Sequence, residues 1–423
     1  MLDIRKLRED PEGVLARLRR RDPDLDLSTL LSLEEERRGL LHRVEELRRQ
    51  RKQGSQKVAL LRAQGEEGKA QQLISSLKGV SEELKELEGR LSQLEGELEA
   101  ELLKLPNLPH DSVPSGPKEE KLLLRAWGEP QKFDFPPKHH VELGRDLGLL
   151  DFQRAAKVAG ARFPMYTGLG AMLELALVCW MFQLHVRQHG YIPVLPPILA
   201  NRTSYLVSGQ LPKFEDELYH CEKDDLFLNP TAESLLVNLH RDEVLAEEEL
   251  PLRYVAYTPC FRREAGTYGE EQRGLIRLHQ FNKVELFHFT TPERSYQDLE
   301  ALVGHAERVL QELGLHYRVM LLTSQDLAQQ SAKTVDIEVW LPGQGRYYEV
   351  SSCSNCEEYQ ARRGNIRFRP AGGGKPRFVH TLNGSGVATS RLFAAILEQN
   401  QTPAGTVVLP ERLAELLGER ELS

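Results

Sequence analysis

A heptad repeat in the first quarter of the chain constrains the fold more than any other feature of this sequence. Its apolar residues recur alternately four and three positions apart, at Leu73, Leu77, Val80, Leu84, Leu87, Leu91, Leu94 and Leu98. This spacing keeps one apolar seam on one side of a helix, so the helix is expected to supercoil around a partner. A second seam lies upstream, at Leu33, Leu40, Val44 and Leu47, and continues less regularly through Val58 and Leu61.

Two glycines, Gly65 and Gly68, separate the two seams. Because glycine breaks helices well, residues 65–68 are predicted to form the tip of an antiparallel helical hairpin that spans about residues 28–105. Each limb of roughly 35 residues would be about 50 Å long at the usual helical rise. A body of about 300 residues has a radius of roughly 20 Å, so the hairpin is expected to project as an arm.

Charge is distributed unevenly along the predicted arm. Residues 37–69 hold ten basic and four acidic residues, a local balance of +6, whereas the returning limb is rich in glutamate. One interpretation is the solvated surface of a coiled coil. The other is a basic stripe that lies along a phosphate backbone, for which arginine is well suited. Charge alone leaves both interpretations open.

The composition of the whole chain excludes several classes of protein. The 423 residues carry a net charge of −8, so any contact with nucleic acid must come from a local basic patch. Five cysteines, an odd number, fit a reducing compartment without a disulfide framework. The N-terminus, MLDIRKLREDPEGV, lacks the apolar core of a signal peptide, and no apolar run is long enough to cross a bilayer. We therefore expect a cytoplasmic protein with no membrane partner.

Proline content and strand patterning divide the chain into three parts. Residues 1–105 form the N-terminal domain, which begins with a short helix at the base of the arm. Four prolines in PNLPHDSVPSGPKEE forbid a continuous helix and predict a linker over residues 106–128. Residues 129–423 form the body.

Helices and strands are mixed in the body without regular βαβ alternation. Helices are predicted over residues 170–190, 298–314 and 387–399, and an extended segment with Pro196 and Pro197 follows the first of them. Strands are predicted over residues 252–264, 275–289, 336–342, 346–352 and 378–386. Hairpins dominate, so the body is expected to be an antiparallel sheet with helices packed against it, which is the α+β class.

The strands at 252–264 and 275–289 carry unusual charge. Residues of equal parity share one face of a strand, so one face is predicted to hold Arg262 and Glu264 beside Arg277, Phe281 and Glu285. These residues could be a solvated face with cross-strand ion pairs. They could also form a site in which arginines clamp phosphate, the aromatic ring stacks on a base, and carboxylates hold an ammonium or hydroxyl group.

The stretch FRREAGTYGEEQRGLIRLHQFNKVEL resembles motif 2 of class II aminoacyl-tRNA synthetases, in the form used by seryl-tRNA synthetases of the bacterial type. Residues 209–219, 229–240, 332–369 and 380–398 resemble further signatures of that family in the same order, and the helix at 170–190 occupies the place of motif 1. With the predicted arm, the likeness covers nearly the whole chain. It implies a class II synthetase catalytic core.

The resemblance implies roles for individual residues. The implied catalytic residues are Arg262, Arg277 and Arg391. The implied serine-binding residues are Thr231, Ala232, Glu233, Arg262, Glu285, Asn383 and Ser385. The implied ATP-binding residues are Arg262, Arg263, Glu264, Arg277, Leu278, Phe281, Glu349, Val350, Ser351, Ser352 and Arg391. Glu349 and Ser352 would also ligate Mg²⁺, and since their spacing of three does not fit one flat strand face, the strand is expected either to bulge or to end there.

The implied activity is that of a serine–tRNA ligase. The enzyme would form seryl-adenylate from L-serine and ATP with Mg²⁺, and would then transfer serine to the terminal adenosine of tRNA(Ser) and of tRNA(Sec). The family works as a homodimer and uses its arm to hold tRNA, so the basic stripe is interpreted as a tRNA contact. The implied contacts are Arg43, Arg48, Arg49, Arg51, Lys52, Lys57 and Arg62.

Two other functions fit parts of the sequence. An amino-acid ligase that loads a carrier protein would be expected to lack the long arm, which this chain keeps. A catalytically dead, tRNA-binding regulator would be expected to have lost the charged groups of the site, whereas Arg262, Glu285 and Arg391 all remain. Serine-dependent pyrophosphate exchange and transfer to tRNA separate the three functions.

Several other features are interpreted as structural. Cys353 and Cys356 make a single CxxC without a second pair, so no zinc is expected. The glycines in AGGGK, residues 371–375, lack the spacing of a P-loop and predict a hairpin turn. The pair His139–His140 is interpreted as packing or surface residues, and His279 as a structural hydrogen-bonding group.

Overall fold

The computed structural model describes residues 1–264 and 274–423, and residues 265–273 of the motif 2 stretch lie outside it. Two compact units make up the chain. The helical unit comprises Ile4–Ala16 and Asp24–Leu105. The sheet unit comprises Met1–Asp3, Arg17–Pro23 and Pro106–Ser423.

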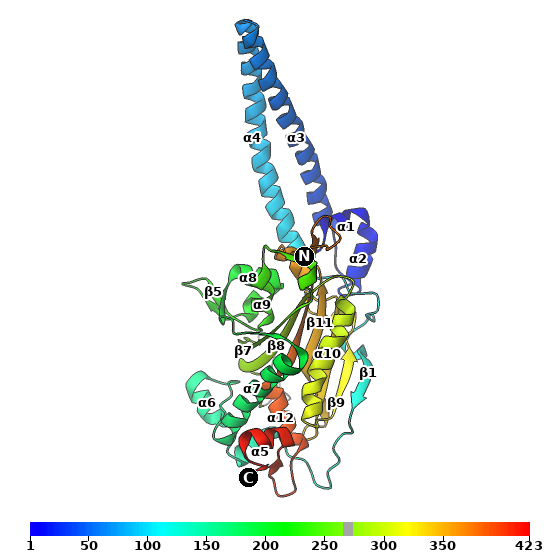
Figure 1. The fold of residues 1–423 in the computed structure, drawn as a ribbon, viewed down its shortest axis with the longest axis vertical. Coiled ribbons are helices and arrows are strands. Elements are labelled where there is room, and N and C mark those ends of the chain that lie inside the picture. The colour runs from blue at the N-terminus through cyan, green and yellow to red at the C-terminus, as the bar shows by residue number, and fades with distance from the viewer. Residues whose placement is uncertain (265–273) are drawn as a thin grey trace. The chain divides into compact units, whose positions relative to one another are not determined.

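The helical unit contains the predicted hairpin. Its two long helices, α3 (Ser28–Ala63) and α4 (Glu67–Lys104), lie side by side (Figure 1). Val44 and Leu47 of α3 are buried against Leu84 and Leu91 of α4, so the two heptad seams face each other as expected. The short helix predicted before the arm is two helices, α1 (Ile4–Glu9) and α2 (Pro11–Arg19), because Pro11 starts a new helix.

The tip of the hairpin is shorter than predicted. Gly65 has a φ of +74°, a left-handed conformation that ends α3 and that glycine adopts without steric cost. Gly68 was expected to belong to the tip, but it lies inside the first turn of α4. No atom lies near its missing Cβ, so Gly68 is a solvated helical residue, which a helix tolerates at a cost of about 1 kcal/mol.

The sheet unit is built on one mixed, mostly antiparallel sheet of eight strands. Their order is β1-β9-β10-β11-β14-β8-β7-β2, and only β2 and β7 pair in parallel. The strands are β1 (Leu122–Trp127), β2 (Ile192–Val194), β7 (Leu252–Phe261), β8 (Gln280–Thr290), β9 (Tyr317–Leu321), β10 (Lys333–Leu341), β11 (Arg346–Glu357) and β14 (His380–Ala388). This is the predicted α+β architecture.

Smaller strands and the remaining helices surround this sheet. The strands are β3 (Leu199–Asn201), β4 (His220–Cys221), β5 (Leu226–Leu228), β6 (Val244–Ala246), β12 (Arg367–Arg369), β13 (Arg377–Phe378), β15 (Val407–Val408) and β16 (Glu421–Leu422). The α-helices are α5 (His140–Asp146), α6 (Phe152–Ala159), α7 (Leu169–His189), α8 (Arg202–Ser208), α9 (Glu233–Leu236), α10 (Ser295–Glu312), α11 (Tyr359–Arg363), α12 (Thr389–Gln399) and α13 (Glu411–Leu417). The 3-10 helices are η1 (Lys118–Glu120), η2 (Glu215–Glu217), η3 (Val237–His240), η4 (Glu247–Glu249) and η6 (Ser324–Asp326).

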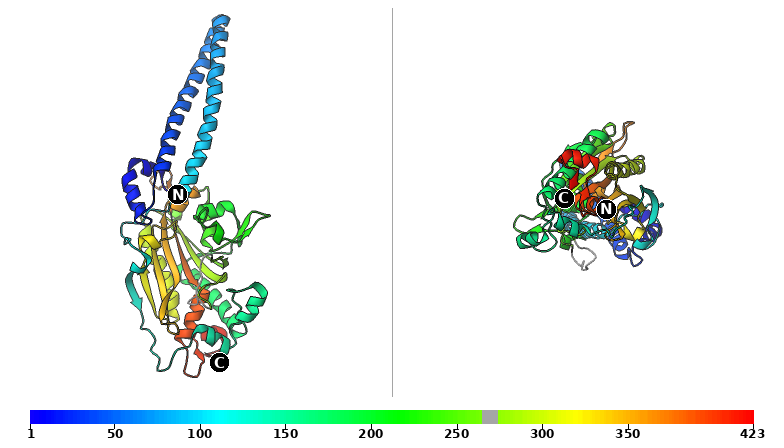
Figure 2. Two further views of the ribbon diagram at one scale, coloured as in Figure 1. Left: turned by 180° about the vertical axis from the view of Figure 1, so that it is seen from behind. Right: turned by 90° about the horizontal axis from the view of Figure 1, so that it is seen from below.

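The segment expected to be a linker takes part in the sheet unit. Strand β1 pairs with β9 at the outer edge of the sheet, where Figure 2 shows it in cyan beside the yellow strand. Upstream of β1, the Asn107 side chain is buried and donates to the carbonyl oxygens of Gln330 and Cys356. The prolines prevent a continuous helix, as predicted, but the segment still packs within the sheet unit.

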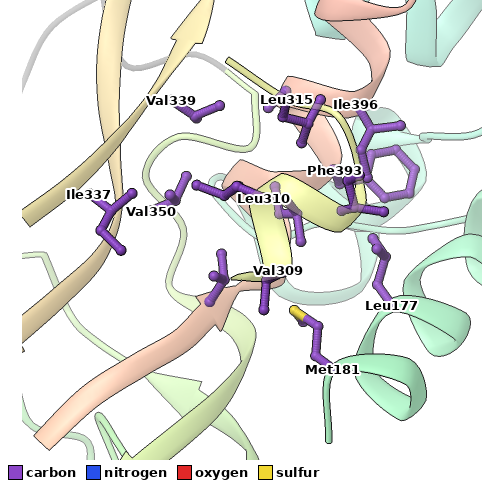
Figure 3. Packing of buried hydrophobic residues seen from close by; sticks show 14 of the residues in the cluster. Leu177, Met181, Val309, Leu310, Leu315, Ile337, Val339, Val350, Phe393 and Ile396 are labelled. Carbon is purple, nitrogen blue, oxygen red and sulfur yellow. The ribbon is translucent and has the colours of Figure 1, made fainter. Parts of the chain in front are cut away.

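One face of the sheet carries the hydrophobic core. Figure 3 shows Leu177 and Met181 of α7 meeting side chains of α10 and α12. Ile337, Val339 and Val350 approach from the sheet. Because α7, α10 and α12 share this core, the opposite face of β8 is free to carry Lys283 and Glu285, and farther along the strand it carries a second hydrophobic cluster with Phe287 and Phe289.

Among the helices of the described residues, α7 alone has the length and the apolar composition of a membrane-spanning helix. Half of that window is buried inside the protein. The buried part includes Leu173, Leu177 and Met181, together with the charged residue Glu174. These contacts identify α7 as a core helix of the sheet unit.

Four histidines and a tyrosine form a partly buried cluster between α7, β8 and α10. The Tyr191 hydroxyl lies 2.7 Å from His288 Nε2 and 3.0 Å from His305 Nδ1. His185 lies 3.0 Å from His189 and is fully buried. Burial, and then the neighbouring His189, lower the pKa of His185 to about 3.

We expect this cluster to make the protein sensitive to acid. The unfolded chain takes up a proton at His185 near pH 6.5, while the folded protein does not until about pH 3, so the stabilisation is complete above pH 6.5 and is lost as the pH falls. In urea unfolding, the advantage of wild type over His185→Gln should shrink by up to about 1.4 kcal/mol for each pH unit below 6.5. A difference between wild type and His185→Gln that stays constant over this pH range would contradict the prediction.

Candidate active site

Three adjoining hollows lie over the polar face of the sheet, and Arg277 lines all of them. The first is lined by Arg262, Glu264, Phe281, Lys283, Glu349, Ser385 and Arg391, among others. The second extends over Asp336, Glu349 and Ser352. The third reaches Thr231 and Gln330. Together they form one branched cleft.

Strand β8 supplies the floor of the first hollow. Phe281 and Lys283 line it, and Glu285 follows on the same face, buried between Ala256 of β7 and Ser385 of β14. The even-numbered residues Val284 and Leu286 point into the hydrophobic core. Phe281 and Glu285 therefore lie on one face of the strand, as predicted from their equal parity.

Arg262, Glu264 and Arg277 reach the cleft by a different route from the one predicted. They were expected on the strands, but β7 ends at Phe261 and β8 begins at Gln280. The ladder continues for one step, from Arg262 N to the His279 carbonyl oxygen, and Glu264 then adopts a φ of +51°, which a strand cannot contain. On the other side, His279 N bonds Arg162 O instead of the neighbouring strand. The irregular backbone at the ends of β7 and β8 therefore carries these three charged residues over the sheet.

The arginines are held in place by protein oxygen atoms and an aromatic ring. The Arg262 guanidinium lies 5.2 Å from the centre of the Phe281 ring, and its Nε donates to Pro230 O at 3.3 Å. Arg277 Nη1 donates to Glu264 Oε2 at 2.8 Å. Arg391 Nε donates to Ile276 O at 3.1 Å. These contacts leave three guanidinium groups around one cavity, which suits a polyanionic ligand.

The expected bulge is present in β11. Ile337 of β10 faces Ser351, but the next residue, Glu338, faces Glu349, so Val350 is the extra residue. The bulge lets both Glu349 and Ser352 line the second hollow. Loss of hydration alone would raise the pKa of Glu349, but the charges of Arg391 and Arg262 outweigh it and hold the pKa below its usual value.

Asp336 adds an acidic group to this hollow that the sequence argument missed. It lies on β10 opposite Ser352, and its Oδ1 atom is buried without a hydrogen-bond partner. Burial, and then the charge of Glu349, raise its pKa well above the usual value. The donor set of Asp336, Glu349 and Ser352 consists of oxygen atoms only, which fits a hard cation such as Mg²⁺.

Thr231, Lys283 and Glu285 form a buried polar triad at the other end of the floor. Thr231 Oγ1 donates to Glu285 Oε2 at 2.8 Å, Lys283 Nζ donates to Thr231 Oγ1 at 2.8 Å, and Lys283 also forms an ion pair with Glu285. The Lys283 and Glu285 side chains are only 8% and 2% exposed. Lys283 was not among the predicted site residues, although its parity matches that of Phe281 and Glu285.

Glu233 lies next to this triad at the start of α9. Its Oε1 accepts hydrogen bonds from Gln330 at 3.0 Å, Gln360 at 2.7 Å and Asn383 at 3.0 Å. Burial, and then the charge of Glu285, raise the pKa of Glu233 to about 7. Nothing in the sequence pointed to Gln330 or Gln360, because they come from distant segments that only the fold brings together.

The structure does not bring all of the predicted side chains into the cleft. Arg263 donates to Leu218 O at 2.9 Å and lies 4.7 Å from the Tyr219 ring centre, so its side chain points elsewhere. Ser351 donates to Ser385 O at 2.6 Å inside the sheet. Ala232 is buried in a hydrophobic cluster behind the site. Leu278 and Val350 are nearly buried and contribute to the wall of the first hollow.

The features interpreted as structural have structural partners. His140 is buried, lies 2.7 Å from Glu398 and accepts from Leu275 N, while His279 lies 3.0 Å from Arg262 O. AGGGK connects the paired strands β12 and β13. Burial raises the pKa of the Cys353 thiol to about 12. Within residues 1–264 and 274–423, one group of three His, Cys, Asp or Glu side chains has ligand atoms within 4.8 Å of one another, namely His139, His140 and Glu398.

Comparison with known proteins decides the family. The sequence profile of the seryl-tRNA synthetase N-terminal domain matches residues 1–109, and that of the tRNA synthetase class II core domain (G, H, P, S and T) matches residues 213–400. The serine–tRNA ligase of Desulforapulum autotrophicum is 50% identical over 422 residues, which cover 100% of this chain and 98% of that protein. The chain belongs to the seryl-tRNA synthetase family.

Further relatives agree with this assignment. The serine–tRNA ligase of Thermodesulfovibrio yellowstonii is 51% identical over 420 residues, which cover 99% of both chains. The crystal structure of seryl-tRNA synthetase from Pyrococcus horikoshii complexed with ATP has a TM-score of 0.94 at 38% identity and covers 100% of this chain and 99% of that one. The likeness therefore extends over both the helical and the sheet unit.

We expect Glu285→Ala to destabilise the protein strongly. The substitution leaves the buried Lys283 ammonium without its carboxylate, and breaking a buried ion pair in this way costs about 3–5 kcal/mol. The matched control is Glu293→Ala, which removes the exposed partner of Arg377 and should cost less than about 1 kcal/mol. Urea unfolding at neutral pH measures both. Equal effects of the two substitutions would show that the triad does not depend on Glu285.

Proposed function

We propose that this protein is a serine–tRNA ligase. It activates L-serine with ATP to form seryl-adenylate and pyrophosphate, and then transfers serine to the 3′-terminal adenosine of tRNA(Ser). The observation that carries the proposal is one continuous cleft, with three guanidinium groups and the Phe281 ring lining one end and a buried carboxylate–hydroxyl cluster at the other. Membership of the family supports the same conclusion.

The first hollow is proposed to bind ATP. Phe281 and Arg391 lie in its wall and would hold the adenine between them through stacking and cation–π attraction. Arg262 would grip the α-phosphate, and Arg277 the outer phosphates. Glu264 orients Arg277 in the free protein and would remain beside the nucleotide. The family's implied contacts at Arg263 and Ser351 could only be made through their backbone atoms, given where their side chains point.

The triad and Glu233 are proposed to bind serine. Glu285 and Thr231, with Ser385 directly across the sheet, would take the hydroxyl group. Glu233, held by three amide groups that include Asn383, would take the ammonium group, and Arg262 the carboxylate. A buried carboxylate left without a hydroxyl partner penalises alanine and glycine, because an unpaired polar group is costly in the interior.

Glu349 and Ser352 are proposed to hold Mg²⁺, and the oxygen-only donor set and the unpartnered Asp336 Oδ1 fit this ion. When bound, the ion supplies positive charge that offsets the negative charge of the phosphates. The protein's own residues act by holding the reacting groups in place. The serine carboxylate is already a nucleophile, so no protein base is needed, and the arginines align it with the α-phosphorus and stabilise the charge that develops.

The helical unit is proposed to bind tRNA. Among the seven predicted contacts, Arg43, Arg48 and Arg62 already form ion pairs with Glu83, Glu88 and Glu67. The others, Arg49, Arg51, Lys52 and Lys57, are exposed and form no ion pair within the described residues. These four residues are therefore the stronger candidates for phosphate contacts. Recognition of backbone shape more than of bases would extend the activity to tRNA(Sec).

Assembly and location follow from the same proposal. Met172 and Leu175 of α7 are 56% and 59% exposed, and Leu195 nearby in sequence is 78% exposed. Apolar side chains exposed at this level favour a homodimer interface along the motif 1 helix, for which the test is the mass in solution. All five cysteines are free thiols, which fits the reducing cytoplasm. The proposed domains remain residues 1–105, 106–128 and 129–423.

Replacing Arg262 with alanine is expected to abolish most of the serine-dependent pyrophosphate exchange. Losing a charge-assisted phosphate contact costs at least about 2 kcal/mol, which corresponds to roughly a thirtyfold loss of kcat/KM. Arg241→Ala serves as the control, since Arg241 donates to Asn238 away from the cleft and should retain wild-type exchange. Full exchange by Arg262→Ala would refute the role of Arg262. No serine-dependent exchange by wild type would refute the proposed function.

Reversing two exposed charges of the arm should affect tRNA and leave serine activation unchanged. The double variant Arg51→Glu with Lys52→Glu is expected to lower kcat/KM for tRNA at least about tenfold, with a weaker salt dependence, because two phosphate contacts are lost. Pyrophosphate exchange should remain at the wild-type rate. Arg48→Gln, which removes a residue already paired with Glu88, should have the smaller effect. An unchanged kcat/KM for tRNA in the double variant would exclude these residues as contacts.

A further inference from the structure

We propose that Lys283 is a further catalytic residue, whose ammonium group contacts the serine carboxylate and the α-phosphate while the acyl-phosphate bond forms. This inference rests on the proposed function. No role was implied for Lys283 by the sequence, and its place in the cleft is a property of the fold.

Lys283 occupies the middle position among the site residues of β8. Phe281, Lys283 and Glu285 alternate on one face, so each lies roughly 7 Å from the next. Phe281 is at the end assigned to adenine, and Glu285 at the end assigned to the serine hydroxyl. In seryl-adenylate the phosphate and the acyl carbon lie between adenine and the hydroxyl. The middle residue of the three therefore faces the atoms that react.

In the free protein, Lys283 contacts the groups that are assigned to the serine hydroxyl. Its Nζ bonds Thr231 Oγ1 at 2.8 Å and pairs with Glu285, the two groups assigned to the serine hydroxyl. An incoming hydroxyl competes for these partners. The released ammonium sits on a flexible four-carbon stem, and it can turn into the first hollow, which Lys283 already lines.

The balance of charge in the cleft also favours a role for Lys283. Glu233 and Glu285 both lie at the serine end, and each would repel the serine carboxylate and the charge that develops on the α-phosphate. Arg262 is at the nucleotide end, over Phe281. Lys283 is the cation placed between these carboxylates and the reacting atoms, with a side chain only 8% exposed. In so little water its charge acts strongly on its neighbours.

The reaction balances without a proton transfer. A serine carboxylate oxygen forms a bond to the α-phosphorus, and the bond from that phosphorus to the bridging oxygen breaks. Pyrophosphate leaves with the electron pair of the broken bond. Lys283 neither gives nor takes a proton in this step, and it acts through its charge.

The competing interpretation is a purely structural ion pair with Glu285. In that case, loss of the lysine would weaken serine binding and the fold but leave turnover at saturating serine intact. A contact made only in the transition state has the opposite signature, because its loss lowers kcat with little change in KM. The ratio of the two kinetic effects therefore decides between the interpretations.

The experiment is serine-dependent pyrophosphate exchange by the full chain with Lys283→Met and Lys283→Arg, at varied serine and varied ATP. We expect Lys283→Met to lose at least about thirtyfold in kcat, with serine KM changed less than about threefold. Lys283→Arg should recover part of the loss, since it restores the charge. Lys333→Met is the matched control, because Lys333 donates to Ser112 away from the cleft and should keep wild-type kinetics.

The outcomes are distinguishable. Wild-type kcat in Lys283→Met, or a loss confined to serine KM, would overturn the role of Lys283 and leave the proposed function standing. Absence of serine-dependent exchange in wild type would overturn both. If thermal unfolding shows that Lys283→Met does not fold, Lys283→Gln keeps a hydrogen-bond donor for Thr231 and is judged by the same kcat and KM criteria.

Discussion

The site depends on the pairing of buried charge on one face of the sheet. Lys283, Glu285 and Thr231 satisfy one another, and Glu233 is held by three amide groups. Each of these charges would be costly in isolation, because the interior cannot replace lost hydration. Paired, these groups are stable in the free protein, although burial by itself would favour their neutral forms. Burial and the charge of Glu285 raise the pKa of Glu233 to about 7, so the charged form of this carboxyl group is only weakly favoured at neutral pH.

The second requirement is irregular backbone at the edges of regular structure. A strand presents alternate residues only, so a flat sheet could not direct both Glu349 and Ser352 into one hollow. The bulge at Val350 solves this problem on β11. At the ends of β7 and β8, the chain leaves the ladder and brings Arg262 and Arg277 over the floor. The sheet tolerates this irregular backbone because the core that it forms with α7, α10 and α12 holds the strands in register.

Prediction from the sequence was most successful where a pattern of residues lies within a single helix or strand. The heptad seams predicted α3 and α4 to within a few residues, and strand parity placed Phe281 and Glu285 on one face. It failed where backbone conformation overrides the pattern. Arg262, Glu264 and Arg277 were expected on strands, and Gly68 at the hairpin tip, because a sequence does not show where a ladder stops or where a solvated helix tolerates glycine. Lys283 was missed although its parity was visible, whereas Gln330 and Gln360 carried no local signal at all.

The sequence by itself determined the helical hairpin, the α+β class and the chemical types of the site residues, because these follow from periodicities and motifs within single segments. Only the tertiary structure decided which of those residues meet. It turned the side chains of Arg263 and Ser351 away from the cleft, added Asp336 and Lys283 to it, and gathered three amides on Glu233. The physical reason is that burial, hydrogen bonding and charge pairing depend on distances between segments far apart in the chain, and those distances exist only once the sheet has formed.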